Sequence, residues 1–368
     1  MRTVVTDMML DDRTKASIRI GALAPLSPPG WVEAGRHLLA GLQLGADEIN
    51  AGGGIDGKPI ELIVRDTAAD PAKATAALGE FAALGVAAVA GEYHSVVARA
   101  AAAQADALAI PYLCSSAVLD ALTEKDSKWV ARLAPAQSRG WRIYADFLLD
   151  SGHRHIAVAS QPSIYWASGI RILRDHLAAV GGNVIELDLR SLSPSAVCDR
   201  IVESHATALL LLVGYPDPAV SVVECVRSDE RLNGILIGAP AGQPEFQDWA
   251  TLLGSRGDAV SFLRYLPERL SPLGDRVATA LLERLGESPS FVAFEGYDSI
   301  VVLADLLKAR NPPLHRPDQP WASVAVEGSR GQISFSRVPG ISVWQWTWPP
   351  VQIVDRDPKT PGRFRRLI

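Results

Sequence analysis

The loop Gly91-Glu92-Tyr93-His94-Ser95 contains acidic, phenolic, imidazole and hydroxyl side chains that could bind or react with a ligand. It connects a short apolar run to a helical pattern, so Ser95 lies at the start of an expected helix. A serine at a helix start can cap the free backbone amides. The same helix start also presents unpaired amides and the positive end of the helix dipole to an anionic or carbonyl group. Ser95 is therefore a candidate for capping or for ligand binding. His94 has no recognisable partner nucleophile or acid, which favours a structural role at the edge of a cleft.

A second polar loop, Cys114-Ser115-Ser116, follows the next apolar run. Its two serines can form a turn or offer hydroxyl groups to a ligand. Cys114 would need a nearby histidine or cation to act as a nucleophile, and none is identifiable. With Cys198 and Cys225 it makes an odd, widely spaced set, which predicts buried free thiols without a disulfide framework or zinc site. Motifs of nucleotide hydrolysis, serine hydrolases and zinc proteases do not occur, so no catalytic residue, metal or cofactor is predicted.

The elements that must position these loops alternate between short apolar runs and helical periods. Strands are expected at 18–23, 60–66, 87–90, 111–114, 156–159, 184–189, 208–213, 234–237, 332–335 and 343–348. Helices are expected at 35–50, 71–84, 97–107, 139–151, 167–180, 195–204, 219–228, 274–285 and 291–309. Such units predict an α/β protein with two doubly wound parallel sheets covered on both faces. Loops after strands should then face one another across a ligand-binding cleft.

Composition excludes several classes of protein. At 368 residues and 48% hydrophobic content, the chain has enough apolar material for two cores. A net charge of -5 provides no broad positive field, so nucleic acid is not expected as the main partner. No apolar run approaches the ~18 residues of a membrane span, so direct membrane insertion is not expected. The basic end, with Arg363, Arg365 and Arg366, is interpreted as a solvated tail.

Residues 1–17 contain three aspartates and lack the apolar run of a secretory signal. The chain as written is therefore expected in the cytoplasm, and in the periplasm or outside the cell if the true start lies upstream.

The segment from Ile18 to Glu92 reads strand, loop, helix, Asn-Ala-Gly-Gly-Gly-Ile-Asp-Gly-Lys-Pro-Ile, strand, Arg-Asp-Thr-Ala-Ala-Asp-Pro, helix, strand, Gly-Glu. It resembles the amino-terminal lobe of type I periplasmic binding proteins, particularly the branched-chain amino acid and short-chain amide binding branch, and the resemblance extends to about Val354. That family implies three crossovers between lobes, which we place near Pro135, Tyr265 and Gly331. The first lobe would comprise 18–134 and 267–330, the second 135–266 and 331–354, with tails at 1–17 and 355–368.

The resemblance also implies a set of ligand-binding residues. The family's loop serine matches Ser95, and the tyrosine of amide-binding members matches Tyr93. Ser115 and Ser116 lie on the second binding loop of the first lobe. Two aromatics of the second lobe match ligand-covering residues: Tyr165, in Ser-Ile-Tyr-Trp-Ala, and Tyr215, in Gly-Tyr-Pro. Trp31, in the first strand-to-helix loop, is a further candidate. Trp344, Trp346 and Trp348 are spaced by two and are interpreted as one face of a final strand on the second lobe.

One departure from the family concerns ligand class. Branched-chain amino acid binders receive the ligand ammonium on a glutamate whose position corresponds to Ala241 here. Because a buried ammonium without a carboxylate partner is costly, an ordinary α-amino acid is disfavoured.

The resemblance implies a non-enzymatic binding protein that closes on a small polar organic ligand: an amino-acid-like molecule, an amide or an aromatic carboxylate. The expected role is the substrate-binding component of an ABC-type importer, with a permease as partner. The alternative is a cytoplasmic ligand sensor that acts on a regulatory protein, and a homodimer is possible in either case. A hydrolase or other α/β enzyme that only looks similar is a third hypothesis, disfavoured by the lack of a nucleophile and base.

Overall fold

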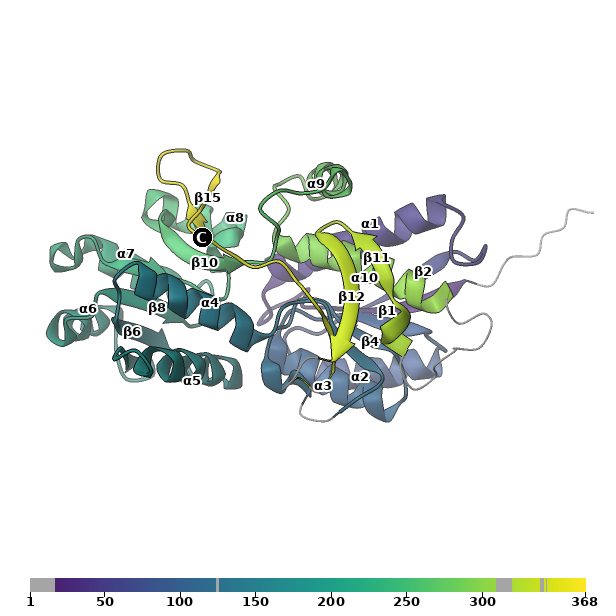
Figure 1. Ribbon diagram of the computed structural model, residues 1–368, viewed down its shortest axis with the longest axis horizontal. Helices are drawn as coiled ribbons and strands as arrows, with labels where there is room; N and C mark the ends of the chain where they lie inside the picture. The colour runs from purple at the N-terminus through teal and green to yellow at the C-terminus, as the bar shows by residue number, and fades with distance from the viewer. Residues whose placement is uncertain (1–16, 124–125, 309–319, 338–340, 342) are drawn as a thin grey trace, which may run out of the picture.

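The computed structural model describes residues 17–123, 126–308, 320–337, 341 and 343–368. It has two lobes lying side by side along the long axis of the molecule, each built on one sheet (Figure 1). Helices flank both faces of each sheet, as the nearly continuous apolar strands predict. No helix in these described ranges is long and apolar enough to cross a membrane.

The first sheet has the strand order β11-β12-β13-β5-β4-β3-β1-β2. Its parallel part runs from β13 to β2, while β11 and β12 are added antiparallel. The elements of this lobe are β1 (Ile18–Ala24), α1 (Val32–Ala51), β2 (Ile60–Asp66), α2 (Pro71–Ala83), β3 (Ala88–Gly91), α3 (Ser95–Ala107), β4 (Tyr112–Cys114), η1 (Asp120–Thr123), β5 (Val130–Arg132), α9 (Pro272–Leu285), α10 (Phe291–Lys308), η5 (Pro320–Ser323), β11 (Ala325–Gly328), β12 (Gly331–Arg337) and β13 (Trp344–Trp346).

The second sheet has the strand order β15-β14-β10-β9-β8-β6-β7, with β14 and β15 antiparallel to an otherwise parallel sheet. The elements of this lobe are α4 (Gln137–Asp150), β6 (His155–Ser160), α5 (Ile164–Ala178), β7 (Asn183–Asp188), α6 (Pro194–Ser204), β8 (Ala208–Leu212), α7 (Ala219–Ser228), η2 (Glu230–Leu232), β9 (Leu236–Gly238), η3 (Gln243–Glu245), α8 (Gln247–Leu253), η4 (Gly254–Gly257), β10 (Val260–Arg264), β14 (Gln352–Arg356) and β15 (Phe364–Arg366).

Helices α1 and α10 cover one face of the first sheet and approach each other unusually closely. A Cβ atom built on Gly41 of α1 would lie 1.9 Å from the carbonyl oxygen of Ala293 in α10. A side chain at this position would therefore force the two helices apart. The same helix pair carries residues of the cleft at its amino-terminal ends, so this packing also positions the site.

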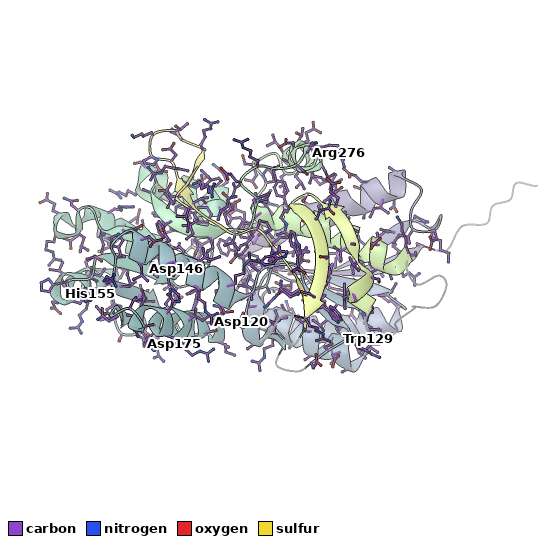
Figure 2. The ribbon with its side chains drawn as sticks, viewed as in Figure 1. Asp120, Trp129, Asp146, His155, Asp175 and Arg276 are labelled. Carbon is purple, nitrogen blue, oxygen red and sulfur yellow. The ribbon has the colours of Figure 1, made fainter. Side chains whose placement is uncertain are left out.

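The chain crosses between the sheets three times. The first crossing lies between β5 and α4, where the Asp120 carboxylate accepts hydrogen bonds from the amide of Ser138 at 3.1 and 3.3 Å. Asp120 lies at the border of the two lobes, whereas Asp146 of α4 and Arg276 of α9 lie on the second and first lobes respectively (Figure 2). The second crossing follows β10, close to the predicted Tyr265. The third falls between β13 and β14, later than the predicted Gly331.

The carboxyl-terminal part of the chain departs from the sequence prediction. Strands β12 and β13 belong to the first sheet, where Trp344 pairs with Ala131 of β5, so residues 331–337 and 344–346 do not lie in the second lobe, where they were predicted. Trp344 and Trp346 of β13 are buried in the first lobe, whereas Trp348 is 78% exposed. The alternating pattern identifies a strand but does not specify which sheet accepts it. The end of the chain is not a tail either, because β15 pairs with β14 and Arg365 forms an ion pair with Asp355.

Candidate ligand-binding site

A cavity of about 320 Å³ lies between the lobes, beyond the carboxyl ends of parallel strands of both sheets. Its lining residues are Pro29, Trp31, Ala69, Tyr93, His94, Ser95, Val96, Val97, Ser116, Val118, Ser163, Tyr165, Trp166, Val213, Gly214, Tyr215, Ala241, Gln243, Tyr265 and Phe291. Six of the seven predicted ligand-binding residues are in this set, and Ser115 is not. The volume suits a compact ligand of about one ring or one branched chain.

The first turn of helix α3 lines the cavity. Within the described part of the chain, the amides of Ser95, Val96 and Val97 donate no hydrogen bond, whereas the amide of Ala98 bonds the His94 carbonyl at 2.9 Å. The helix starts two residues earlier than predicted, and the Ser95 side chain does not cap it. Three amide donors and the positive end of the helix dipole are thus available to a carboxylate or carbonyl group.

The buried carboxylate of Glu92 fixes the loop that precedes this helix. Its Oε1 accepts from the amides of Tyr93 and His94 at 2.8 and 2.9 Å, and its Oε2 accepts from the Thr67 hydroxyl at 2.6 Å. Burial raises the pKa of Glu92 to about 7, and these three donors oppose that rise. Because Glu92 occupies the two amides before the helix, the donors left for a ligand are those of the helix itself.

The predicted serines have different surroundings. Ser95 Oγ accepts from the Leu119 amide at 3.3 Å, which leaves its own hydrogen free to donate. Ser116 Oγ donates to Glu295 and can accept from a ligand. Ser115 is fully buried, and its hydroxyl contacts the Gly91 amide at 3.1 Å and Ser299 Oγ at 2.7 Å. Ser95 and Ser116 line the cavity, whereas the hydroxyl of Ser115 is used within the first lobe.

An aromatic wall encloses the rest of the cavity and joins the lobes. The rings of Trp31, from the first lobe, and Tyr215, from the second, are 4.9 Å apart between centroids. Tyr93 meets Trp31 edge-on at 5.5 Å. Tyr165 packs against Trp166 at 4.6 Å on the second-lobe side. Such rings provide large apolar contact at low entropic cost, which suits a flat or branched apolar ligand body.

The described lining residues contain no Asp, Glu, Lys or Arg, and His94 is the one lining side chain that could be charged near neutral pH. His94 Nε2 accepts from the Trp31 amide at 3.0 Å, and burial lowers its pKa to about 4, so the ring is neutral. Ala241, at the position where the resemblance places an ammonium-binding glutamate, lines the cavity without a polar side chain. The described wall therefore offers hydrogen-bond donors to an anion but no carboxylate to a cation.

Two buried glutamates, one from each lobe, accept hydrogen bonds from backbone amides at a helix start of the other lobe. Glu33 of α1 accepts from the amides of Gln247 and Asp248 at 2.9 and 3.4 Å, at the start of α8 in the second lobe. Glu245 of η3 in turn accepts at 3.1 Å from the amide of Phe291, at the start of α10 in the first lobe. Each carboxylate thus caps a helix across the cleft, which stabilises the closed arrangement.

These closure contacts were not found from sequence. Glu33 and Glu245 are separated from their partners by 214 and 46 positions respectively. For Glu33 the available signal was only a glutamate just before an expected helix, which is common in helices without such a role. Glu245 gave no signal, because no helix was expected in that part of the chain.

Glu33 also belongs to a group that could suggest a metal site, with His37 and Glu287. The hydrogen bonds argue otherwise. His37 Nδ1 accepts from the Ser290 amide at 3.0 Å, so in the neutral ring Nε2 carries the proton and donates to Glu287 Oε1 at 3.0 Å. Arg36 forms an ion pair with the same Glu287. The group is therefore explained as a hydrogen-bonded network.

Cys114 is fully buried beside the site. Its thiol donates to the Ala117 carbonyl at 3.5 Å, and burial raises its pKa to about 12. Such a thiol remains protonated and does not act as a nucleophile at neutral pH, in agreement with its interpretation as a structural residue.

Comparison with known proteins identifies relatives of this arrangement. A family model described as "Periplasmic binding protein" matches residues 17–319. The chain is 29% identical over 194 residues to "Leu/Ile/Val-binding protein homolog 8" of Brucella abortus (strain 2308), a match that covers 50% of this chain and 47% of the relative. The chain spans about half the length of the curated relatives it matches.

Two solved structures show the fold. One is the branched-chain amino acid transporter substrate-binding protein LivJ of Streptococcus pneumoniae in complex with isoleucine, with a TM-score of 0.80, 20% identity and coverage of 95% of this chain and 99% of that chain. The other is a solute-binding protein of an ABC transporter from Rhodopseudomonas palustris BisB5 in complex with 3,4-dihydroxy benzoic acid, with a TM-score of 0.76, 20% identity and coverage of 92% and 93%. The predicted two-lobe fold is thereby confirmed.

Proposed function

The chain belongs to the periplasmic binding protein family, and we propose that it captures a small carboxylate as the substrate-binding component of an ABC-type importer. In this proposal the ligand carboxylate lies at the start of α3, against the amides of Ser95, Val96 and Val97 and the Ser95 hydroxyl. Its apolar body packs against Trp31, Tyr93, Tyr165 and Tyr215. No chemical step is assigned to the site.

The observation that supports this ligand class is the uncharged cavity wall. Helix amides and a serine can stabilise a carboxylate, but the described lining has no carboxylate to receive an ammonium, and Ala241 occupies the expected position of one. An α-amino acid would leave its ammonium without a charged partner, at a cost of several kcal/mol. Aromatic and branched acids or amides without an α-ammonium should therefore bind better, and the structural relative that holds 3,4-dihydroxy benzoic acid is consistent with this class.

Closure supplies the mechanism of capture. A ligand that contacts both lobes favours the closed form by its difference in affinity for the closed and open forms. The aromatic contact between Trp31 and Tyr215 and the helix caps by Glu33 and Glu245 are made only when the lobes meet. The closed form is then the state that a permease would recognise.

Matched ligand pairs test the ligand class. Isothermal titration should compare leucine with 4-methylpentanoate and phenylalanine with 3-phenylpropanoate, because each pair differs only in the ammonium group. We expect each acid to bind at least about 10-fold more tightly than its amino acid. Tighter binding of the amino acids would refute the proposal.

A variant sharpens this test. Ala241→Glu places a carboxylate on the cavity wall and should shift the preference toward the amino acids. Ala179→Glu adds the same charge at an exposed position outside the cavity and should leave the preference unchanged. An unaltered preference in Ala241→Glu would contradict the placement of the ligand.

Uptake by cells tests the role in transport. Cells that lack this chain should lose uptake of the labelled acid that binds the purified protein, and the chain expressed in trans should restore it. Unchanged uptake would contradict the importer role and favour the alternative of a ligand sensor that acts on a regulatory protein.

A further inference from the structure

Two cysteines that are far apart in sequence meet on the second lobe. Cys198 of α6 and Cys225 of α7 are 27 positions apart, and their sulfur atoms are 3.4 Å apart. The third cysteine, Cys114, is buried in the first lobe. Helices α6 and α7 pack against each other on one face of the second sheet (Figure 1). We propose that Cys198 and Cys225 are a dithiol–disulfide pair that oxidation converts into a covalent link between these helices.

The sulfur positions allow the bond to form with little change in the backbone. A disulfide needs a sulfur–sulfur distance of about 2.05 Å, so the two atoms must approach by about 1.4 Å. If both side chains share the movement, each sulfur moves by about 0.7 Å, which corresponds to a rotation of roughly 25° about χ1. Packed helices tolerate such rotations more easily than a shift of the helix axes.

The two thiols differ in access to solvent. Cys198 is 1% exposed, whereas Cys225 is partly exposed. Burial raises the pKa of the Cys198 thiol, and the hydrogen bond to Cys225 raises it further. Cys225 is therefore the thiol that an external oxidant reaches first, and Cys198 is placed to resolve the product.

The reaction balances as two thiol–disulfide exchanges with an external disulfide such as oxidised glutathione. The Cys225 thiolate attacks one glutathione sulfur, which forms a mixed disulfide and releases one glutathione thiolate. Cys198 then loses its proton to solvent and attacks Cys225 Sγ, which releases the second glutathione. Two electrons pass from the cysteine pair to the oxidant, and the products are one protein disulfide and two reduced glutathione molecules.

The link would enclose a segment that carries part of the cavity wall. Strand β8, the loop with Gly214 and Tyr215, and the start of α7 all lie between the two cysteines. Closing this loop reduces the conformational freedom of the unfolded chain, so the oxidised protein should be the more stable form. The redox state of the pair would also report whether the chain resides in an oxidising or a reducing compartment.

The test uses the purified full chain treated with oxidised glutathione or with dithiothreitol, followed by thiol titration under denaturing conditions, intact mass and peptide mapping. We expect the oxidised chain to retain only the Cys114 thiol, to lose about 2 Da, and to yield a peptide that joins Cys198 to Cys225. Its melting temperature should rise by about 5–15 °C. Three titratable thiols after oxidation, or a melting temperature that does not rise, would overturn the proposal.

Single variants separate the two roles. Cys198→Ser should accumulate the mixed disulfide with glutathione on Cys225, whereas Cys225→Ser should resist oxidation. Cys114→Ser is the matched control and should form the link as the wild type does. Equal modification of Cys198→Ser and Cys225→Ser would contradict the assigned order of attack.

Discussion

Replacing Glu33 by glutamine should remove part of the pH dependence of stability of the closed protein. The Glu33 side chain is 6% exposed and caps α8 across the cleft. Burial raises its pKa from 4.5 to about 7, the nearby Asp248 carboxylate adds to the rise, and the two amide donors oppose it. Glutamine keeps an oxygen that can accept the same hydrogen bonds but does not ionise.

The expected sign follows from proton binding. Between pH 4.5 and about 7 the folded protein holds a proton on Glu33 that the unfolded chain has lost, so the wild type loses stability as pH rises through this range. A rise from 4.5 to about 7 corresponds to about 3 kcal/mol at 1.36 kcal/mol per pH unit. This value is the largest effect the pKa permits, and solvent that reaches the exposed Asp248 reduces it.

Urea unfolding followed by tryptophan fluorescence at pH 5, 6, 7 and 8 measures the effect. The unfolding free energy of the wild type should fall relative to that of Glu33→Gln as pH rises, and the difference between the two proteins should become constant above about pH 7. Glu92 and Glu295, whose pKa values are also raised to about 7 by burial, are present in both proteins and cancel.

Glu61→Gln serves as the control, because hydrogen bonds from Ser17 and Arg19 lower the pKa of this exposed carboxylate. The Glu61 carboxylate contributes stability that is lost as pH falls. The unfolding free energy of the wild type should therefore rise, not fall, relative to that of Glu61→Gln as pH increases. Parallel pH profiles for wild type and Glu33→Gln would show that Glu33 is not buried between the lobes in solution, and would refute the closure contact.

Two further predictions concern the site and its support. Ser95→Ala should weaken binding of the acid found by titration by about 10-fold or more, because it removes a hydrogen bond to a charged group, while Ser115→Ala should not change affinity; equal losses in both variants would argue against the placed carboxylate. Arg330→Ala should lower the free energy of unfolding by about 3–5 kcal/mol, measured by urea unfolding, because it leaves Glu295 and Asp298 buried without their cation; Arg276→Ala, which breaks a more exposed ion pair, should cost at most about 1 kcal/mol.

Much of the fold was predictable because its signals are local. The strand at 60–66 and the helix near 71–84 were found almost to the residue, since Asp70 caps that helix and Pro71 starts it. Crossovers were predicted near Pro135 and Tyr265, and the chain passes between the sheets after β5 and after β10. The sheet that accepts β12 and β13 was predicted wrongly, because alternation in β13 is equally compatible with either sheet, and only the pairing with β5 decides.

The candidate site shows the same division. The family resemblance, applied to loops after strands, predicted Trp31, Tyr93, Ser95, Ser116, Tyr165 and Tyr215 as ligand-binding residues, and all six line the cavity. Loops after parallel strands meet at one edge of a sheet, which brings these residues together. Ser115 is the adjacent residue on the same loop, yet its hydroxyl turns toward Ser299, 184 positions away. Nothing near Ser115 in the sequence specifies that partner.

The succession of strands and helices, the two-lobe organisation and the loops that border the cleft can be predicted from local patterns, because periodicity, caps and apolar runs act over a few neighbouring residues. The sheet that takes the last strands, the glutamates that cap helices across the cleft and the meeting of Cys198 with Cys225 follow only from how the elements pack. These contacts join residues 27 to 214 positions apart, and they depend on how packed surfaces meet.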